Sequence, residues 1–475
     1  MQDRFHRWIF YLIPLAFMLV TPWIASEAGL WIGYGKHLWS DWHFLYQDNF
    51  SLLPTDNNIT SSWLPSLIYF GLYKVGNIWA VAHFHHLCLL VLLWLIYRKT
   101  LFTSSWPWRV QDRLPIYLMW LGAGIYFSFR PNLLALIPFL IAYEILDSHI
   151  RTQKSLTRES WIKLLLLQIV WVNVHGSFVI LPLLTAWYLL QRRQDLQKSD
   201  VAGTVLTAAA CLINPYGWKI IPYVLKTQNT SSAHQIEEWA SAFSWDYPTQ
   251  TVLLWAVLGF FCWRLATSKD KSLWQSAFTP LLLLPFAGLR LSVFAFIALP
   301  LFVKSWMQFS TSTPPKSNPP QGNGLLPFAV ILALAVLGTP YLKTHLPMQI
   351  PERIAAPFDP ESVFKIADKI NQTCPAYCPV YNDFAVGGFL LMATDNPLLI
   401  DGRVTPFTPE AWVKYQDFLL KEDLSGILSI KTGVFSVLSK QRSASLIDRL
   451  KNAGFTEQQW ENSYVLLYRP ESIAP

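Results

Sequence analysis

Apolar runs of membrane-spanning length recur along the first two-thirds of the chain, with short polar loops between them. A helix needs about 20 apolar residues to cross a bilayer, a length that a large soluble protein with buried helices does not require. We therefore predict a polytopic α-helical membrane protein. Interpreting each run as one span gives about 11 spans, near residues 8–25, 77–97, 114–129, 132–147, 162–173, 177–190, 201–213, 251–265, 276–289, 291–306 and 325–341.

The first of these runs has two interpretations. The small residues IAS that end it also fit the cleavage site of a signal peptide. We interpret the run as an uncleaved first span, because a chain with so many further spans does not need a separate signal.

After about residue 345 the apolar runs give way to a pattern typical of a soluble domain. Short strands are predicted in CPVYND, NPLLIDGR, VFSVLS and YVLLYRP, and amphipathic helices in PESVFKIADKIN and SASLIDRLKNAGF. The stretch STSTPPKSNPPQGNG before the last span is a Pro/Ser/Gly linker. The predicted organisation is a transmembrane domain over residues 1–345, with a first outer loop over about 26–76, and a small α/β domain over residues 346–475.

The distribution of charge orients these elements. The net charge is +7 and charged residues make up only 14% of the chain. The basic residues gather in alternate short loops rather than in one stripe, which excludes a nucleic-acid partner and is typical of cytoplasmic loops. The N-terminus is therefore predicted inside and, with an odd number of spans, the C-terminal domain outside. The predicted inside loops contain Arg98, Lys99, Arg109, Arg113, Arg151, Lys154, Arg158, Lys163, Arg192, Arg193, Lys198, Arg264, Lys269 and Lys271.

Two of the five cysteines lie in the polar C-terminal part, in the stretch TCPAYCP. Cys374 and Cys378 have the spacing of half a metal site, but no second Cys/His pair accompanies them. A local disulfide on an oxidising face is the favoured interpretation. Cys88, Cys211 and Cys262 lie in apolar runs and are interpreted as small buried hydrophobes.

Polar residues gather where the topology places the outer ends of spans. The stretch WVNVHGSFVI carries Asn173 and His175 in a turn between two spans, and Arg130 and Arg290 lie in two other outer turns. Asn214 and Tyr216 lie at the outer end of a further span. A turn explains Asn and Gly, and snorkelling to headgroups explains a single Arg. Several such residues on one face instead predict an anion site, since Arg matches phosphate oxygens geometrically.

Two predicted outer loops combine tryptophans with acids. The first contains Asp41, Asp48 and Asp56, and the second contains His234, Glu237 and Glu238. Aromatic faces beside carboxylates suit sugar rings, whereas an interfacial aromatic belt with solvated acids is the alternative. A divalent cation is a further option for the second loop, although no spacing is diagnostic of a metal.

The motifs follow one another in a recognisable order, namely Arg130-Pro131, Asn173/His175/Gly176, Asn214-Pro215-Tyr216-Gly217-Trp218, Glu238-Trp239, Leu289-Arg290, Asn382-Asp383, Gly387-Gly388 and Asp401-Gly402-Arg403. This ordered set resembles the GT-C superfamily of integral-membrane glycosyltransferases, and within it a poorly characterised bacterial branch. The match extends along nearly the whole chain. One departure concerns the first outer loop, where Ser62 stands in place of a second acid that relatives carry.

The resemblance implies a transferase that moves a sugar, with inversion, from a polyprenyl-phosphate donor to a glycan, lipid or protein acceptor. It implies a bacterial inner membrane with the C-terminal domain on the periplasmic side. Asp48 is then the general base, and the substrate-binding residues are Arg130, Asn173, His175, Asn214, Tyr216, Glu238, Arg290, Asn382, Asp383, Asp401 and Arg403. Asp401 and Arg403 are equally well interpreted as a turn held by a buried ion pair. The alternative function, favoured by Ser62, is a non-catalytic assembly subunit or a carrier of lipid-linked glycans.

Overall fold

The computed structural model describes residues 26–41, 50–55, 59–100, 110–127, 129–233, 242–243, 248–267, 272–310, 360–374, 377–403, 407–461 and 463–470. The chain divides into two compact units. The first comprises residues 1–23 and 82–348, and the second comprises residues 24–81 and 349–475. The second unit therefore contains the predicted first outer loop together with the C-terminal domain. The predicted boundary at residues 345–346 lies outside the described residues.

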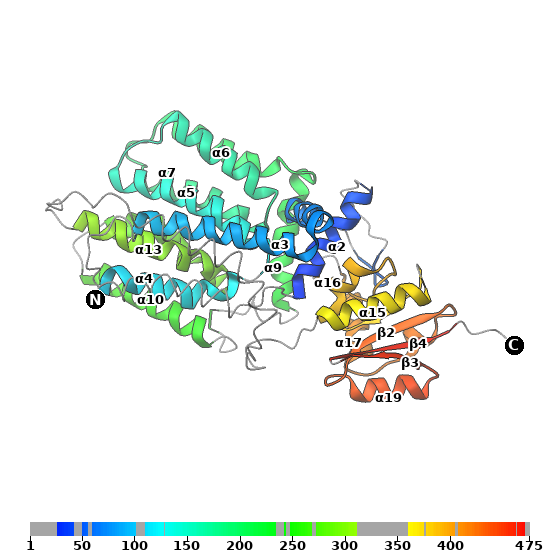
Figure 1. Cartoon of the computed structure of the whole chain (residues 1–475). Coiled ribbons are helices and arrows are strands. Elements are labelled where there is room, and N and C mark those ends of the chain that lie inside the picture. Colours follow the sequence, from blue (N-terminus) through cyan, green and yellow to red (C-terminus); the bar gives the residue numbers. More distant parts are fainter. Residues whose placement is uncertain are drawn as a thin grey trace. The chain divides into compact units, whose positions relative to one another are not determined.

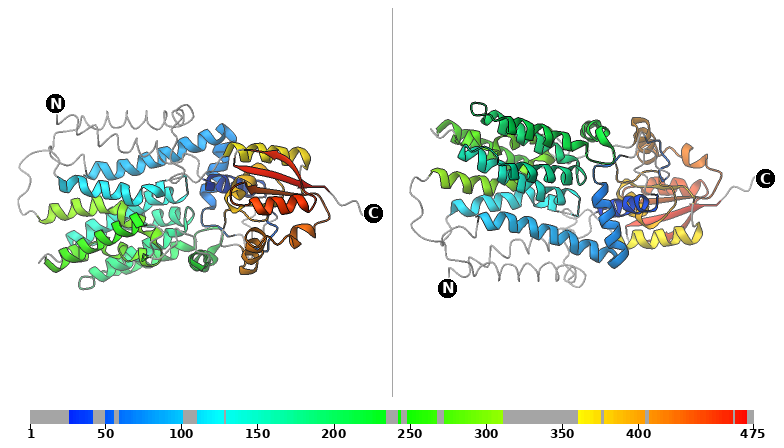
Figure 2. Two further views of the ribbon diagram at one scale, coloured as in Figure 1. Left: turned by 90° about the horizontal axis from the view of Figure 1, so that it is seen from below. Right: turned by 90° about the horizontal axis from the view of Figure 1, so that it is seen from above.

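The first unit is a helical bundle, in which α5 lies beside α6 and α7, and α13 packs on α4 and α5 (Figures 1 and 2). Most of its helices occur where a span is predicted. They are α4 (Val110–Ala123), α5 (Asn132–Thr152), α6 (Arg158–Val172), α7 (Ile180–Gln191), α8 (Lys198–Ala209), α10 (Pro248–Thr267) and α13 (Ser292–Ser310). Helix α9 (Ile220–Ala233) instead lies between the predicted spans 201–213 and 251–265, where no span is predicted.

Three helical stretches of the described residues are long and apolar enough to cross a membrane, at Trp63–Thr100, Asn132–Thr152 and Leu289–Trp306. Shorter apolar helices lie at Leu114–Ala123, Gly176–Gln191, Thr251–Trp263 and Phe384–Ala393. These helices confirm a membrane protein, whereas the number of eleven spans stays a prediction. The predicted spans 8–25 and 325–341 lie outside the described residues.

Helix α3 (Trp63–Thr100) contains a kink at the position where a span is predicted to begin. Gly76 and Asn77 leave helical geometry, and Asn77 has a φ of 53°. Asn tolerates this left-handed region better than other residues with a Cβ atom. The kink separates the helical stretch that begins at Trp63 from the predicted span over residues 77–97.

The predicted span over residues 276–289 is not one helix. The structure has instead the short helices α11 (Ser272–Gln275) and α12 (Phe278–Leu281), followed by the 3-10 turns η6 (Leu284–Phe286) and η7 (Leu289–Leu291). Pro280 and Pro285 explain the breaks, because a proline inside a helix removes a backbone donor and clashes with the preceding turn.

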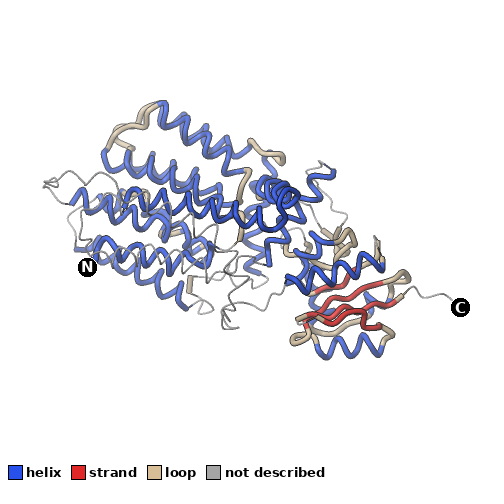
Figure 3. Tube along the Cα trace, viewed as in Figure 1, coloured by secondary structure: helices blue, strands red, loops and turns tan. Residues whose placement is uncertain are grey.

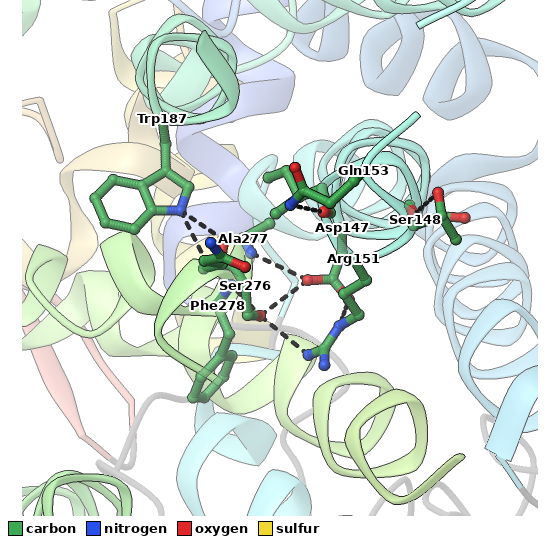
Figure 4. Close-up of polar contacts among 11 residues, drawn as sticks. Asp147, Ser148, Arg151, Gln153, Trp187, Ser276, Ala277 and Phe278 are labelled. Atoms are coloured by element: carbon green, nitrogen blue, oxygen red, sulfur yellow. Dashed lines mark hydrogen bonds and ion pairs between the residues drawn. The ribbon is translucent and has the colours of Figure 1, made fainter. Parts of the chain in front are cut away.

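An ion pair buried in the first unit connects α5 to this irregular stretch (Figure 4). Asp147 accepts hydrogen bonds from Arg151 Nε (2.7 Å), Ser276 Oγ (2.8 Å) and the Ala277 amide (3.0 Å). The Arg151 guanidinium also donates to Ser276 Oγ and lies over the ring of Phe302. Arg151 is therefore a buried, paired residue, although the sequence analysis counted it among the loop charges.

The second unit contains a four-stranded sheet in the order β1-β2-β4-β3 (Figure 3). The strands are β1 (Val380–Asn382), β2 (Val434–Ser439), β3 (Thr456–Trp460) and β4 (Tyr464–Arg469), with β1 parallel to β2 and the other pairs antiparallel. Helix α15 (Pro360–Thr373) lies on one face and α19 (Ala444–Asn452) on the other (Figure 1). Strand β2 is almost wholly buried because both of its faces are covered.

The predicted helices over 360–371 and 443–455 are confirmed, as are the strands in CPVYND, VFSVLS and YVLLYRP. The predicted strand in NPLLIDGR is wrong, because Leu398 forms only isolated bridges, one to Val380 and one to Ser51. Strand β3 was not predicted, since its sequence TEQQW is polar. The disulfide between Cys374 and Cys378 is confirmed, with a Cα–Cα distance of 6.3 Å.

Helix α2 (Ser26–Asp41) packs closely against α16 (Phe384–Ala393). A Cβ atom on Gly388 would lie 2.8 Å from the Leu30 amide nitrogen, and one on Gly29 would lie 2.7 Å from the Phe389 Cα atom. Only glycines permit such a short distance between two helix backbones. The Gly387-Gly388 motif therefore has a packing role, and α16 is apolar on all sides because it is buried.

Candidate functional site

The turn between α6 and α7 holds His175 in one defined tautomer. The Ser177 amide donates to His175 Nδ1 (3.2 Å), so Nδ1 carries no proton. Trp171 Nε1 donates to Ser177 Oγ (3.0 Å), which leaves the Ser177 hydroxyl to donate to the same Nδ1 (2.9 Å). The proton of the neutral imidazole is thus on Nε2, where it is a hydrogen-bond donor.

Arg290 acts on His175 electrostatically. It lies in η7, directly before α13. Burial, and then the nearby positive charge of Arg290, lower the pKa of His175 to about 3. These two predicted site residues therefore interact electrostatically, although they lie in turns more than 100 positions apart in the sequence. A neutral donor beside a guanidinium is suited to an anion such as phosphate.

Asn173 connects its own turn to the neighbouring turn at Asn214, and Asn214 stabilises that second turn. Asn173 Nδ2 donates to the carbonyls of Ile169 (2.7 Å) and Ile213 (2.9 Å). Asn214 Nδ2 donates to the Cys211 carbonyl (2.8 Å), and its side-chain oxygen accepts from the Tyr216 amide (2.8 Å). Both amides thus shape the backbone at this end of the bundle. Their binding of substrate stays a prediction.

Arg130 lies in the turn between η1 (Gly124–Phe127) and α5, and a histidine that the sequence analysis missed holds this turn. His85 Nε2 donates to the Phe127 carbonyl (3.2 Å), and the His85 ring stacks on Phe129 at 4.9 Å. The signal for His85 is present in the sequence, because a buried ionisable residue in an apolar span is a candidate functional residue. The convergence of Arg130 with His175 and Arg290 stays a prediction.

The predicted site residues of the C-terminal domain are buried and hydrogen-bonded. Asn382 Nδ2 donates to the Ile400 carbonyl (2.7 Å). Asp383 caps α16 by accepting from the Ala385 amide (3.0 Å). Asp401 forms an ion pair with Arg403, whose guanidinium donates to both carboxylate oxygens. This arrangement agrees with the expected ion-paired turn, while a role in substrate binding stays a prediction.

Asp48 and Glu238 lie outside the described residues, as do His234 and Glu237. Ser62, which stands in place of the second acid, is buried at the start of α3 and accepts from the Ser66 hydroxyl through its carbonyl (2.9 Å). Among the residues that the structure describes, no group of three or more His, Cys, Asp or Glu side chains is arranged to hold a metal ion. The divalent cation considered for the second outer loop stays a prediction.

Comparisons with known proteins identify the fold. No family model matches the chain, and no curated protein matches it in sequence. Two similar solved structures are those of ArnT from Cupriavidus metallidurans, one bound to undecaprenyl phosphate and one in the apo state. The first has a TM-score of 0.53 at 12% identity and covers 97% of each chain, and the second has a TM-score of 0.52 at 12% identity and covers 98% of each chain.

A third structure, of the oligosaccharyltransferase AglB from Archaeoglobus fulgidus, covers 94% of this chain and 72% of its own at 11% identity. Its TM-score of 0.46 is too low to support an argument. The match to both ArnT structures over nearly their whole length confirms the GT-C-like fold that the sequence motifs imply.

Proposed function

We propose that this protein is a glycosyltransferase that moves a sugar from a polyprenyl-phosphate donor to an acceptor at the periplasmic face of the bacterial inner membrane. The observation that carries the proposal is a neutral His175, held as an Nε2 donor and influenced by the charge of Arg290, in a GT-C-like fold. An ArnT structure with the same fold contains undecaprenyl phosphate, a lipid phosphate of the kind that the proposed donor would carry.

In this proposal the lipid phosphate binds to His175 and Arg290, with Arg130 as a third partner. The neutral imidazole donates from Nε2, because its Nδ1 already accepts from Ser177. The acceptor hydroxyl attacks the anomeric carbon as the bond from that carbon to the phosphate oxygen breaks. The negative charge that develops on the departing phosphate is stabilised by the fixed positive charge, which is effective in a poorly hydrated site.

Asp48 is the proposed general base and takes the proton of the attacking hydroxyl. A carboxylate within about 3 Å of that hydroxyl is sufficient for this step. Attack from the face opposite the phosphate inverts the configuration of the sugar. The disulfide between Cys374 and Cys378 supports an oxidising, outer location of the C-terminal domain, because disulfides persist in such compartments.

The test compares Arg290→Ala with Arg193→Ala in the purified protein. Arg193 is an exposed arginine in a predicted inside loop and serves as the matched control. We expect Arg290→Ala to weaken binding of a polyprenyl phosphate by at least about tenfold, because a charge-assisted phosphate contact is lost, while Arg193→Ala binds normally. Equal binding by both variants would refute the anion site. Tight binding by the wild type with no sugar transfer to any acceptor would favour the carrier function instead.

A further inference from the structure

Residues 50–55 of the first outer loop are built into the C-terminal domain. The Leu52 amide donates to the Leu398 carbonyl (2.8 Å), and the Leu398 amide donates to the Phe50 carbonyl (2.9 Å). Thr55 forms an antiparallel bridge with Phe407. These backbone pairs join segments almost 350 positions apart within one compact unit.

Side chains strengthen the same junction. The Phe50 ring stacks on His37 of α2, with centroids 4.4 Å apart, and the Arg403 guanidinium lies 4.5 Å from the centroid of the same ring. Arg403 Nη2 also donates to Ser51 Oγ (3.0 Å). The side chains of Phe50 and Ser51, the two residues that follow Asp48-Asn49 in the sequence, therefore both contact the arginine of the Asp-Gly-Arg motif.

The planar guanidinium of Arg403 makes several contacts at once. Nε and Nη2 bind the Asp401 carboxylate, at 2.9 and 2.6 Å, while Nη2 also reaches Ser51. The pair is almost fully buried, with 7% of the Arg403 side chain and 1% of the Asp401 side chain exposed. A lysine keeps the charge but lacks this fork of donors, so it cannot make the same set of contacts.

We infer that the Asp401–Arg403 ion pair is a positioning element for the first outer loop, through which the C-terminal domain holds residues 50–55 in place. The inference rests on the proposed function in one respect, namely that the held segment follows the proposed general base, Asp48. Asp48, the proposed base, is only two residues before Phe50 in the sequence. The loop segment that follows Asp48 and the Asp-Gly-Arg motif would then act together, with Asp401 and Arg403 supporting the reaction without contacting substrate.

The experiment uses two variants of the full-length protein and one control. Ser51→Ala removes one acceptor and leaves the ion pair intact, so it tests the contact even where Arg403→Lys disturbs folding. Arg449→Lys is the matched control, because Arg449 forms an exposed ion pair with Glu422 in the same unit. Hydrogen–deuterium exchange reports on the Leu52 and Leu398 amides, and sugar transfer from a polyprenyl-phosphate donor is measured for all variants.

We expect exchange at Leu52 and Leu398 to accelerate by at least about tenfold in Arg403→Lys and by a smaller factor in Ser51→Ala, because hydrogen bonds to a charged group are lost. Exchange in β2 should stay as in the wild type. The turnover number should fall in the same order, while the KM for the lipid donor changes by less than about twofold, because an interaction used only in the transition state is affected. The control should match the wild type in every measurement.

Three results would overturn the inference. The first is that exchange at residues 50–55 stays unchanged in Arg403→Lys. The second is that exchange in β2 accelerates as much as exchange at Leu52 and Leu398. The third is that exchange at residues 50–55 accelerates while the turnover number stays unchanged. If the wild type transfers sugar from no polyprenyl-phosphate donor, the proposed function fails. The exchange data then still decide whether Arg403 holds the loop.

Discussion

Replacing Arg151 by leucine should destabilise the helical bundle strongly. The Arg151 side chain is fully buried and that of Asp147 is 5% exposed. In the variant the Asp147 carboxylate keeps its hydrogen bonds from Ser276 and the Ala277 amide, but it loses the positive charge of Arg151 that pairs with it. A buried carboxylate without an opposite charge is costly, because water no longer solvates it.

The magnitude follows from this geometry. Removing one partner of a buried ion pair typically costs about 3–5 kcal/mol. The two remaining donors to Asp147 favour the lower end, about 3 kcal/mol. A unit of this size loses roughly 2 °C of Tm for each kcal/mol, so we expect Tm to fall by about 6 °C. Replacing both partners together by apolar residues should cost less, because no unpaired charge is then buried.

The assay is thermal unfolding of the purified protein in detergent, followed by intrinsic tryptophan fluorescence. Lys163→Leu is the matched control, since Glu159 and Lys163 form an ion pair with the same i,i+4 spacing on an exposed helix face. It should leave Tm unchanged. A Tm for Arg151→Leu within 1 °C of the wild type, or a double variant less stable than the single one, would refute the reasoning about buried charge.

Three further predictions concern other parts of the chain. Because the folded pKa of His175 is lowered to about 3, the unfolded state takes up its proton first as pH falls below 6.5. His175 should therefore reduce stability as pH falls from 6.5 to 3, by at most about 1.4 kcal/mol per pH unit. The pH dependence of stability should differ between wild type and His175→Gln in that window alone. Gly388→Ala should destabilise the second unit by about 1–3 kcal/mol, because the added Cβ atom clashes with the Leu30 backbone. Gly71→Ala is the control, since a Cβ atom there would meet its nearest neighbour, a Trp39 side-chain atom, only at 4.0 Å. Equal Tm values for both variants would contradict the packing argument. A reporter fused after Pro475 should be active only outside the cytoplasm, and activity inside would refute the predicted orientation.

Several features were predictable because they depend on residues close in sequence. The helices α5, α6 and α7 follow apolar runs, and α15 and α19 follow amphipathic periods that a window of a dozen residues reveals. The disulfide joins cysteines only four positions apart. The irregular stretch over 276–289 was mispredicted as one span because apolar composition outweighed the effect of its prolines.

The candidate site was predictable in its residue types but not in its geometry. An apolar chain that carries His175 and Arg290 at span ends indicates an anion site by composition and topology alone. The electrostatic effect of Arg290 on His175 depends on how turns from distant parts of the chain pack, and the tautomer of His175 depends on its local hydrogen bond from Ser177. His85 stands out in the sequence as an ionisable residue in an apolar span, but its hydrogen bond to the Phe127 backbone carbonyl is visible only in the folded structure.

The sequence by itself determined the membrane class, most helix positions and the order of the motifs, because hydrophobic periodicity and local spacing are properties of short segments. Only the tertiary structure decided that residues 50–55 belong with the C-terminal domain and that Arg403 contacts Phe50 and Ser51. A bridge such as that between Ser51 and Leu398 leaves no periodic signal in either segment. It forms because folding brings together backbone donors and acceptors that are hundreds of residues apart in sequence. Once buried, these groups form hydrogen bonds with each other, because an unpaired buried N–H or C=O group costs free energy.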